Sequence, residues 1–126
     1  MSYLLDVNSL VALGYRGHLF HERTSAWAEG MKLFTASISE LGFVRVLIQL
    51  PEVDVSMQTC KQLLKVMKAE RDIHLLEDGL GVADLPSWVK KPKQITDGHL
   101  LELARRNGSQ LATLDQRIPG AFLIPR

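Results

Sequence analysis

The sequence predicts an α/β fold with a mainly parallel central sheet flanked by helices. Short apolar runs of strand character alternate with helical segments along the whole chain, which is typical of strands joined by crossover helices. Acidic residues directly follow several of these runs, and ligand sites in such sheets form beyond the carboxyl ends of the strands. With 126 residues, 46% of them apolar and 23% charged, the chain has the size and composition of one globular domain. We therefore expect a single domain over residues 1–126.

The first half of the chain contains two expected strands and three expected helical segments. Asn8 is available as a helix cap after the first strand, and Ser37-x-x-Glu40 has the form of a capping box. The expected order is a strand over 2–5, a helix from Ser9, a helix over 21–31, a strand over 32–36, and a helix from Ser37 to Leu50, before Pro51.

The helix expected to end at Leu50 is apolar on more than one face. It is therefore either wholly internal or partly buried by another subunit, and we expect a homodimer that buries part of this helix or of the next one. The apolar residues are Leu41, Phe43, Val44, Val46, Leu47, Ile48 and Leu50.

The second half continues the alternation. A helix is expected over 56–71, with Cys60 in a core stripe that also contains Leu63, Leu64 and Met67. A short strand over 74–76 follows, and after a loop with two prolines Thr96 is expected to cap a helix that ends at Asn107-Gly108. Two closing strands are expected over 110–114 and 122–124.

Composition excludes several classes of protein. The N-terminus lacks a secretory signal and no apolar run approaches the ~20 residues of a membrane span, so a soluble, cytoplasmic protein is expected. The single cysteine allows no internal disulfide. A net charge of +1 argues against attraction of nucleic acid by the whole surface, although it allows a local basic patch.

Four acidic residues, Asp6, Glu40, Asp97 and Asp115, lie where apolar runs give way to a helix or turn. Each has an ordinary structural explanation: Glu40 in a capping box, Asp97 in a helix first turn, and Asp115 in a turn. Asp6 has no obvious capping role while Asn8 is available, and all four map to one edge of the predicted sheet. The pattern therefore favours a shared site.

Carboxylates that converge repel one another unless protons or a cation neutralise them. Their oxygen atoms suit Mg²⁺, or alternatively Mn²⁺, and such a cation can bind a phosphate oxygen and activate water. Spacing alone leaves a metal site and four unrelated structural acids as comparable readings.

The sequence around these acids resembles, in order, the motifs of PIN-domain ribonucleases of the VapC toxin type, and the resemblance covers nearly the whole chain. Four motifs in order within a domain of this length are fairly specific. They are Tyr3-Leu4-Leu5-Asp6-Val7-Asn8, the segment from Thr35 through Glu40 to Leu47, Ile95-Thr96-Asp97-Gly98-His99-Leu100-Leu101, and Leu111-Ala112-Thr113-Leu114-Asp115.

The resemblance implies a PIN-like fold, magnesium-dependent RNA cleavage, a homodimer, and inhibition by a small antitoxin protein that inserts a segment into the active site. It implies Asp6, Glu40, Asp97 and Asp115 as catalytic and metal-binding residues, with Asn8 and Thr113 as supporting polar residues. Two departures affect loop geometry and substrate preference. Gly98 stands where the family often has alanine, and Gln116-Arg117-Ile118-Pro119 lacks the usual aromatic or glycine pattern.

The expected reaction is hydrolysis of a phosphodiester by metal-activated water, which leaves a 5′-phosphate and a 3′-hydroxyl. Attack by the RNA 2′-hydroxyl usually relies on paired groups such as histidine, and the four histidines here are scattered. His18-x-x-His21-Glu22 does not match the zinc helix motif. Basic residues that could contact RNA, or simply be solvated, are Lys61, Lys65, Lys68, Lys90, Lys91 and Lys93.

Two other functions compete with this interpretation. One is a catalytically inactive PIN-like module that binds RNA or protein, although a binding site needs no such concentration of acids. The other is a phosphatase with an aspartyl nucleophile, which the lack of a second acid in Asp6-Val7-Asn8 disfavours.

Overall fold

The computed structural model describes residues 1–126, and its centre is one sheet of five parallel strands in the order β3-β2-β1-β4-β5. The central strand β1 pairs with β2 on one side, where Leu4 lies opposite Phe34, and with β4 on the other, where Leu5 lies opposite Ala112. All four pairings are parallel, which confirms the predicted α/β class. The strands are β1 (Ser2–Leu5), β2 (Lys32–Thr35), β3 (His74–Leu75), β4 (Gln110–Thr113) and β5 (Phe122–Leu123).

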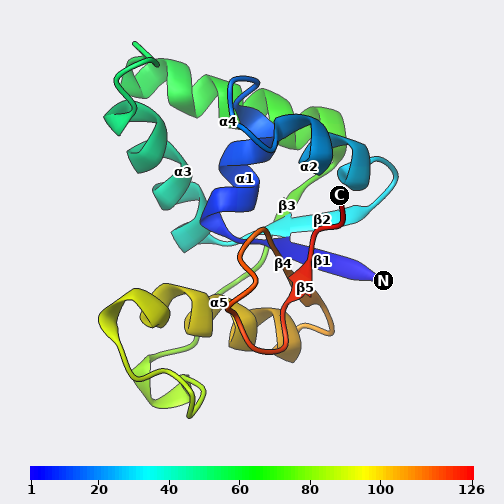
Figure 1. The fold of residues 1–126 in the computed structure, drawn as a ribbon, viewed down its shortest axis with the longest axis vertical. Helices are drawn as coiled ribbons and strands as arrows, with labels where there is room; N and C mark the ends of the chain where they lie inside the picture. The colour runs from blue at the N-terminus through cyan, green and yellow to red at the C-terminus, as the bar shows by residue number, and fades with distance from the viewer.

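Helices cover both faces of the sheet unequally. In Figure 1, α1 to α4 lie on one side of the strands, whereas α5 and the segment that precedes it lie on the other. Two short 3₁₀ turns, Val82–Asp84 and Pro92–Gln94, shape that preceding segment. The helices are α1 (Val7–Gly14), α2 (His21–Ala28), α3 (Ser37–Gln49), α4 (Met57–Arg71) and α5 (Ile95–Arg106).

Alternation along β1 explains why the core has two parts. Successive side chains of a strand point to opposite faces, so Tyr3 and Leu5 join the larger cluster beneath α1 to α4, whereas Leu4 joins the smaller one beneath α5. In the smaller cluster Leu4 packs with Leu100 of α5 and Leu111 of β4. Strand β1 is therefore buried from both sides, which fixes the position of its carboxyl end.

The order and type of the predicted elements are confirmed, and so is the end of the last helix at Asn107-Gly108, but the predicted N-terminal caps are wrong. Helix α1 begins at Val7, and its N-cap is Asp6, whose side chain accepts a hydrogen bond from the Ser9 backbone N–H. Asn8 is exposed and already inside the helix. Asp6, rather than Asn8, caps the helix because the preceding strand ends at Leu5. The first free backbone N–H groups of the helix therefore lie within reach of the Asp6 carboxylate.

The expected capping box at Ser37 and the expected cap at Thr96 are also absent. Helix α3 starts at Ser37 itself after Ala36, without a side-chain cap. Helix α5 starts one residue before Thr96, because the 3₁₀ turn Pro92–Gln94 runs directly into it and leaves no break in the backbone for a cap.

The apolar helix α3 is not wholly internal. Phe43 and Leu47 are fully buried, whereas Leu41 is 64% exposed and Ile48 is 41% exposed. In α4, Cys60, Leu64 and Met67 form the predicted buried stripe, but Leu63 is 37% exposed, outside that stripe. Exposed apolar side chains thus occur on both helices. None of the helices has the length and apolar character needed to cross a bilayer.

Gly98, in the first turns of α5, allows a close approach by the segment that precedes the helix. A Cβ atom at this position would overlap Cγ2 of Val89, and Trp88 lies nearby. Glycine is therefore required by packing, in the place where the sequence departs from the usual alanine.

Substitution of Gly98 should reverse the usual sign of a helix glycine-to-alanine change. Gly98→Ala should lower the free energy of unfolding by about 1 kcal/mol, since overpacking costs ~1–3 kcal/mol and helix propensity returns up to ~1 kcal/mol. In a Val89→Ala background the same change should become stabilising, because the overlap is gone. Urea denaturation of the four proteins of this cycle measures both values, and a destabilisation of equal size in both backgrounds would exclude the contact as its cause.

Candidate active site at the carboxyl ends of the strands

The order of the sheet reverses at β1: β2 follows on one side of it and β4 on the other. Ligands in open parallel sheets bind at such a switch point, beyond the carboxyl ends of the strands. Asp6 directly follows β1, and Asp115 lies two residues after the end of β4. Two of the four predicted acids therefore flank the switch point.

Asp6 is a buried carboxylate, with 4% of the residue exposed. Its Oδ1 accepts a hydrogen bond of 2.8 Å from the backbone N–H of Ser9, whose hydroxyl donates to the carbonyl oxygens of Asp6 and Ala112. Burial raises the pKa of Asp6, the Asp115 charge raises it further, and hydrogen bonds from Thr113 and Ser9 oppose the shift. The site thus contains an acid that a nearby positive charge would stabilise in its ionised form.

Asp97, in the first turn of α5, is repelled by both Asp6 and Asp115. Burial first, and then the charges of Asp6 and Asp115, raise its pKa to about 6, against the opposing effect of Arg117. No hydrogen bond contributes to this shift. Asp97 therefore interacts with two other acids, and only the charge of Arg117, without a hydrogen bond, opposes this repulsion.

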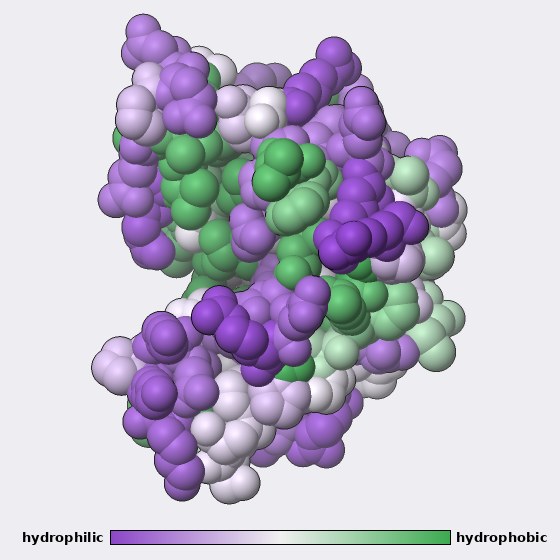
Figure 2. All heavy atoms as spheres, in the orientation of Figure 1, coloured by the Kyte–Doolittle hydropathy of each residue, from purple (hydrophilic) through white to green (hydrophobic).

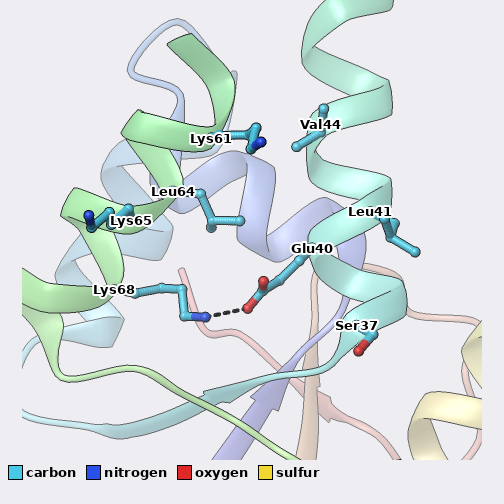
Figure 3. A pocket seen from close by; sticks show the side chains of 8 residues that line it. All are labelled: Ser37, Glu40, Leu41, Val44, Lys61, Leu64, Lys65 and Lys68. Atoms are coloured by element: carbon cyan, nitrogen blue, oxygen red, sulfur yellow. Dashed lines mark hydrogen bonds and ion pairs between the residues drawn. The ribbon is translucent and has the colours of Figure 1, made fainter. Parts of the chain in front are cut away.

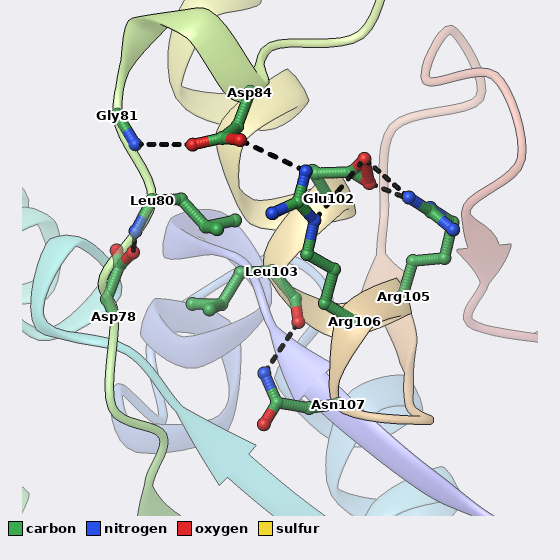
Figure 4. A network of polar contacts seen from close by, with 9 residues as sticks. All are labelled: Asp78, Leu80, Gly81, Asp84, Glu102, Leu103, Arg105, Arg106 and Asn107. Atoms are coloured by element: carbon green, nitrogen blue, oxygen red, sulfur yellow. Dashed lines mark hydrogen bonds and ion pairs between the residues drawn. The ribbon is translucent and has the colours of Figure 1, made fainter.

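Contacts on the far side of α5 hold Asp97 in place. His99, two residues along the helix, pairs with Asp78 of the loop after β3. Figure 4 shows a second set, in which Arg106 reaches both Asp84 and Glu102. These pairs connect the loop to α5 and fix the orientation of the helix that presents Asp97.

Asp115 lies at the rim of the site and has a partner of its own. Arg117 binds it with both side-chain and backbone groups: Nε to Oδ1 at 3.0 Å, Nη2 to Oδ2 at 3.1 Å, and its backbone N–H to Oδ1 at 2.9 Å. These contacts lower the pKa of Asp115. Its carboxylate is thus ionised and already compensated.

Glu40 lies at the end of the neighbouring strand β2 and is held by two other groups. Its Oε2 accepts a hydrogen bond from the hydroxyl of Thr35, at 2.5 Å. It also accepts one from Nζ of Lys68 in α4, at 2.6 Å, which Figure 3 shows. Ser39 donates to the carbonyl oxygen of Leu5 at 2.8 Å, which ties the start of α3 to the end of β1. These bonds replace the capping box that the sequence predicted for Glu40.

The two predicted supporting residues have different environments. Thr113 is buried at the end of β4, lowers the pKa of Asp6 by hydrogen bonding, and accepts from the backbone N–H of Asp115. Asn8 is exposed; its Oδ1 pairs with Nε2 of His18, and the residue lines a pocket that also contains Asp115. Thr113 is therefore integrated with the acids, whereas Asn8 lies at their edge.

The structure brings three of the four acids into one electrostatic cluster and places Glu40 beside it, at the next strand end. As the side chains stand, no three His, Cys, Asp or Glu residues form a group that could hold one metal ion. This holds for the His18-x-x-His21-Glu22 pattern as well, where His21 instead bonds the backbone oxygen of Ala12.

The sequence did not identify the residues that hold the acids. Ser9 and Thr35 were not predicted to bind Asp6 and Glu40, although a serine three residues after Asp6 and a threonine at a strand end are the signals for these contacts. Arg117, two residues after Asp115, was not predicted as a site residue; the segment that contains it only departs from the family pattern. Arg117 lines a pocket of about 330 Å³ with Asp97, Asp115, Lys91 and Lys93.

Similarity to known proteins agrees with this geometry. No family model matches the chain. Ribonuclease VapC38 of Mycobacterium tuberculosis is 36% identical over 120 aligned positions, which cover 89% of this chain and 84% of that protein. The chain belongs to the VapC ribonuclease family.

Other relatives extend over almost the full length. Ribonuclease VapC44 of Mycobacterium tuberculosis is 35% identical, over 96% of this chain and 94% of its own, and ribonuclease VapC29 is 29% identical over 99% and 98%. The crystal structure of VapBC2 from Rickettsia felis, bound to a DNA fragment from its promoter, has a similar fold, with a TM-score of 0.63, 13% identity, and coverage of 98% of this chain and 97% of that one. The predicted relationship to VapC-type PIN-domain toxins is confirmed.

The pKa of Asp97 predicts how stability depends on pH in the absence of divalent cations. The folded-state pKa of about 6 lies above the ordinary value of 3.8, so the folded state binds the proton more tightly, and stability decreases as the pH rises from about 4 to about 6. Asp97→Asn should therefore melt at a higher temperature than the wild type at pH 7 in chelator. The difference should vanish near pH 4.

Asp84 offers a control of opposite sign, because its hydrogen bond from Gly81 and its Arg106 contacts lower its pKa. Asp84→Asn should melt below the wild type at pH 7 and approach it in acid. Thermal melts monitored by circular dichroism measure both series. An Asp97→Asn protein less stable than the wild type at pH 7 would contradict the repulsion among the three acids.

Proposed function

We propose that this protein is a magnesium-dependent endoribonuclease that acts as the toxin of a toxin-antitoxin pair and hydrolyses RNA phosphodiesters with metal-activated water. The observation that carries the proposal is the cluster of Asp6, Asp97 and Asp115 at the switch point of the sheet, where burial and the two neighbouring acids raise the pKa of Asp97. Membership of a family of ribonucleases supports the reaction type.

The donor set fits a hard divalent cation. Carboxylate oxygens suit Mg²⁺, or Mn²⁺ in its place. Burial, and then the charges of neighbouring acids, raise the pKa values of Asp6 and Asp97, so a cation at this position would stabilise both carboxylates. Asp6, Asp97, Asp115 and Glu40 would hold the ion. Bound there, it would activate water and offset charge on the phosphate.

The other residues of the site bind the RNA phosphate or orient the Asp6 carboxylate. Lys91 and Lys93 line the same pocket as Asp97 and carry the charge needed to attract an RNA phosphate. Thr113 and Ser9 keep the Asp6 carboxylate oriented by hydrogen bonds. No pair of histidines lies among these acids to support attack by a 2′-hydroxyl, which favours products with a 5′-phosphate and a 3′-hydroxyl.

Removal of the Asp97 charge should abolish cleavage without loss of the fold. Asp97→Asn should reduce metal-dependent cleavage of single-stranded RNA by about a hundredfold or more, since changes to residues that only support metal ligands already cost ~10–100-fold. The circular dichroism spectrum should not change. Asp54→Asn, at an exposed acid between α3 and α4, should keep full activity. Full activity of Asp97→Asn would overturn the role of Asp97, whereas a lack of metal-dependent cleavage by all three proteins would favour the inactive binding module.

A pocket of about 660 Å³ between α3 and α4 suits the antitoxin. Its apolar lining is Leu41, Val44 and Leu64, and Lys61 and Lys65 stand along α4 above Lys68 and Glu40 (Figure 3). An antitoxin segment with apolar and acidic side chains complements this lining and would reach Glu40. The VapBC2 structure, a toxin-antitoxin complex by its name, supports the existence of such a partner.

A homodimer would use a different part of the same helices. Three apolar residues are each 37–41% exposed: Ile48 of α3 and Leu63 and Val66 of α4. Figure 2 shows apolar residues gathered on the visible side of this helical layer. Burial of exposed apolar side chains is a common basis for symmetric association.

Two pairs of substitutions separate these partners. Leu63→Glu with Val66→Glu should convert a dimer, of twice the 14.1 kDa chain mass, into a monomer in light scattering, because it introduces charge into the apolar contact. Lys61→Glu with Lys65→Glu should leave the dimer intact and weaken copurification of the antitoxin. A wild-type protein that is monomeric at all accessible concentrations would remove the dimer.

A further inference from the structure

Arg117 forms a salt bridge with Asp115, one of the carboxylates that would hold the proposed cation. All three contacts are made by one residue, and both carboxylate oxygens are engaged. An acid held in this way cannot turn both oxygens to a cation. In this arrangement no three acidic side chains form a metal-holding group.

The Arg117–Asp115 pair also lies between two hollows of the surface. On one side is the pocket of about 330 Å³ with Asp97, Lys91 and Lys93; on the other is a pocket of about 430 Å³ with Asn8 and Gln116. Both pockets are lined by Asp115 and Arg117, so movement of the guanidinium would change the boundary between them. Its side chain is 80% exposed, and no packing opposes that movement.

We propose that Arg117 is an internal counter-cation of the active site: it compensates Asp115 in the metal-free protein, gives way when Mg²⁺ binds, and then binds a phosphate of the RNA. The inference rests on the proposed function. A guanidinium suits both partners, because its planar set of donors matches a carboxylate and a phosphate equally. Lys91 and Lys93, in the same pocket, supply the field that attracts the phosphate.

The two parts of this exchange predict opposite effects of one substitution. Arg117→Gln removes the competing charge, so the protein should bind Mn²⁺ about three- to fivefold more tightly, an effect in the range of exposed ion pairs. It should also raise KM for single-stranded RNA several-fold at saturating Mn²⁺, because a phosphate contact is lost. Electron paramagnetic resonance of free Mn²⁺ measures the first effect without reference to activity.

Arg105→Gln is the matched control. Arg105 makes a similar two-pronged pair with Glu102, at 2.7 Å for both bonds, but on the outer part of α5. The substitution changes the net charge equally, so it should leave Mn²⁺ affinity and KM near the wild-type values. An Arg117→Gln protein with unchanged or weaker Mn²⁺ affinity, or with a gain no larger than that of Arg105→Gln, would overturn the competition; an unchanged KM would overturn the phosphate contact.

Asp97→Asn separates failure of this inference from failure of the proposed function. If the wild type binds Mn²⁺ and Asp97→Asn does not, the acids hold the cation, and the Arg117 result then tests the inference alone. If both proteins bind Mn²⁺ equally weakly, the metal site itself is wrong.

Discussion

The carboxylate of Asp6 connects the sheet, the first helix and the acidic cluster. It ends the central strand, caps α1 through the Ser9 N–H, and is buried within reach of the charge of Asp115. Capping favours the ionised form, because the helix N-terminus is electropositive. Burial opposes it, and burial is the larger effect. The fold thus uses the Asp6 carboxylate as a helix cap and at the same time makes its ionisation costly by burial. Because a cation would stabilise the ionised form, this position suits a cation.

Close packing of helices around Asp6 brings the other acids near. Gly42 of α3 faces Val7 of α1, and a Cβ atom at Gly42 would overlap the valine side chain. Because α3 can approach the start of α1 this closely, Glu40 lies at the strand end next to Asp6. Gly98 allows the same kind of approach on the opposite face, where Val89 packs against the turn that follows Asp97. A small residue therefore follows two of the four acids for the same physical reason.

The sequence was sufficient to predict the alternation of elements, because apolar runs and prolines mark them clearly. It also identified the three acids that cluster, since the carboxyl ends of parallel strands meet at one edge. It could not choose between Asp6 and Asn8 as the cap, because both residue types cap helices well and the choice depends on where the strand ends. The sequence could not predict the partners of Glu40 and Asp115 either. Lys68 reaches Glu40 only through the packing of α3 against α4, and the Arg117 contact depends on the conformation of a turn.

The central pairing of β1 with β4 has a consequence for synthesis of the chain. Strands that are neighbours in the sheet lie at opposite ends of the sequence, and contacts of such long separation form late and slowly. On the ribosome, β1 must wait for β4 to emerge before it gains its second neighbour. Asp115 comes later still, so an incomplete nascent chain cannot assemble the acidic cluster. The topology therefore delays the appearance of the complete site until the segment that follows β4 has been synthesised.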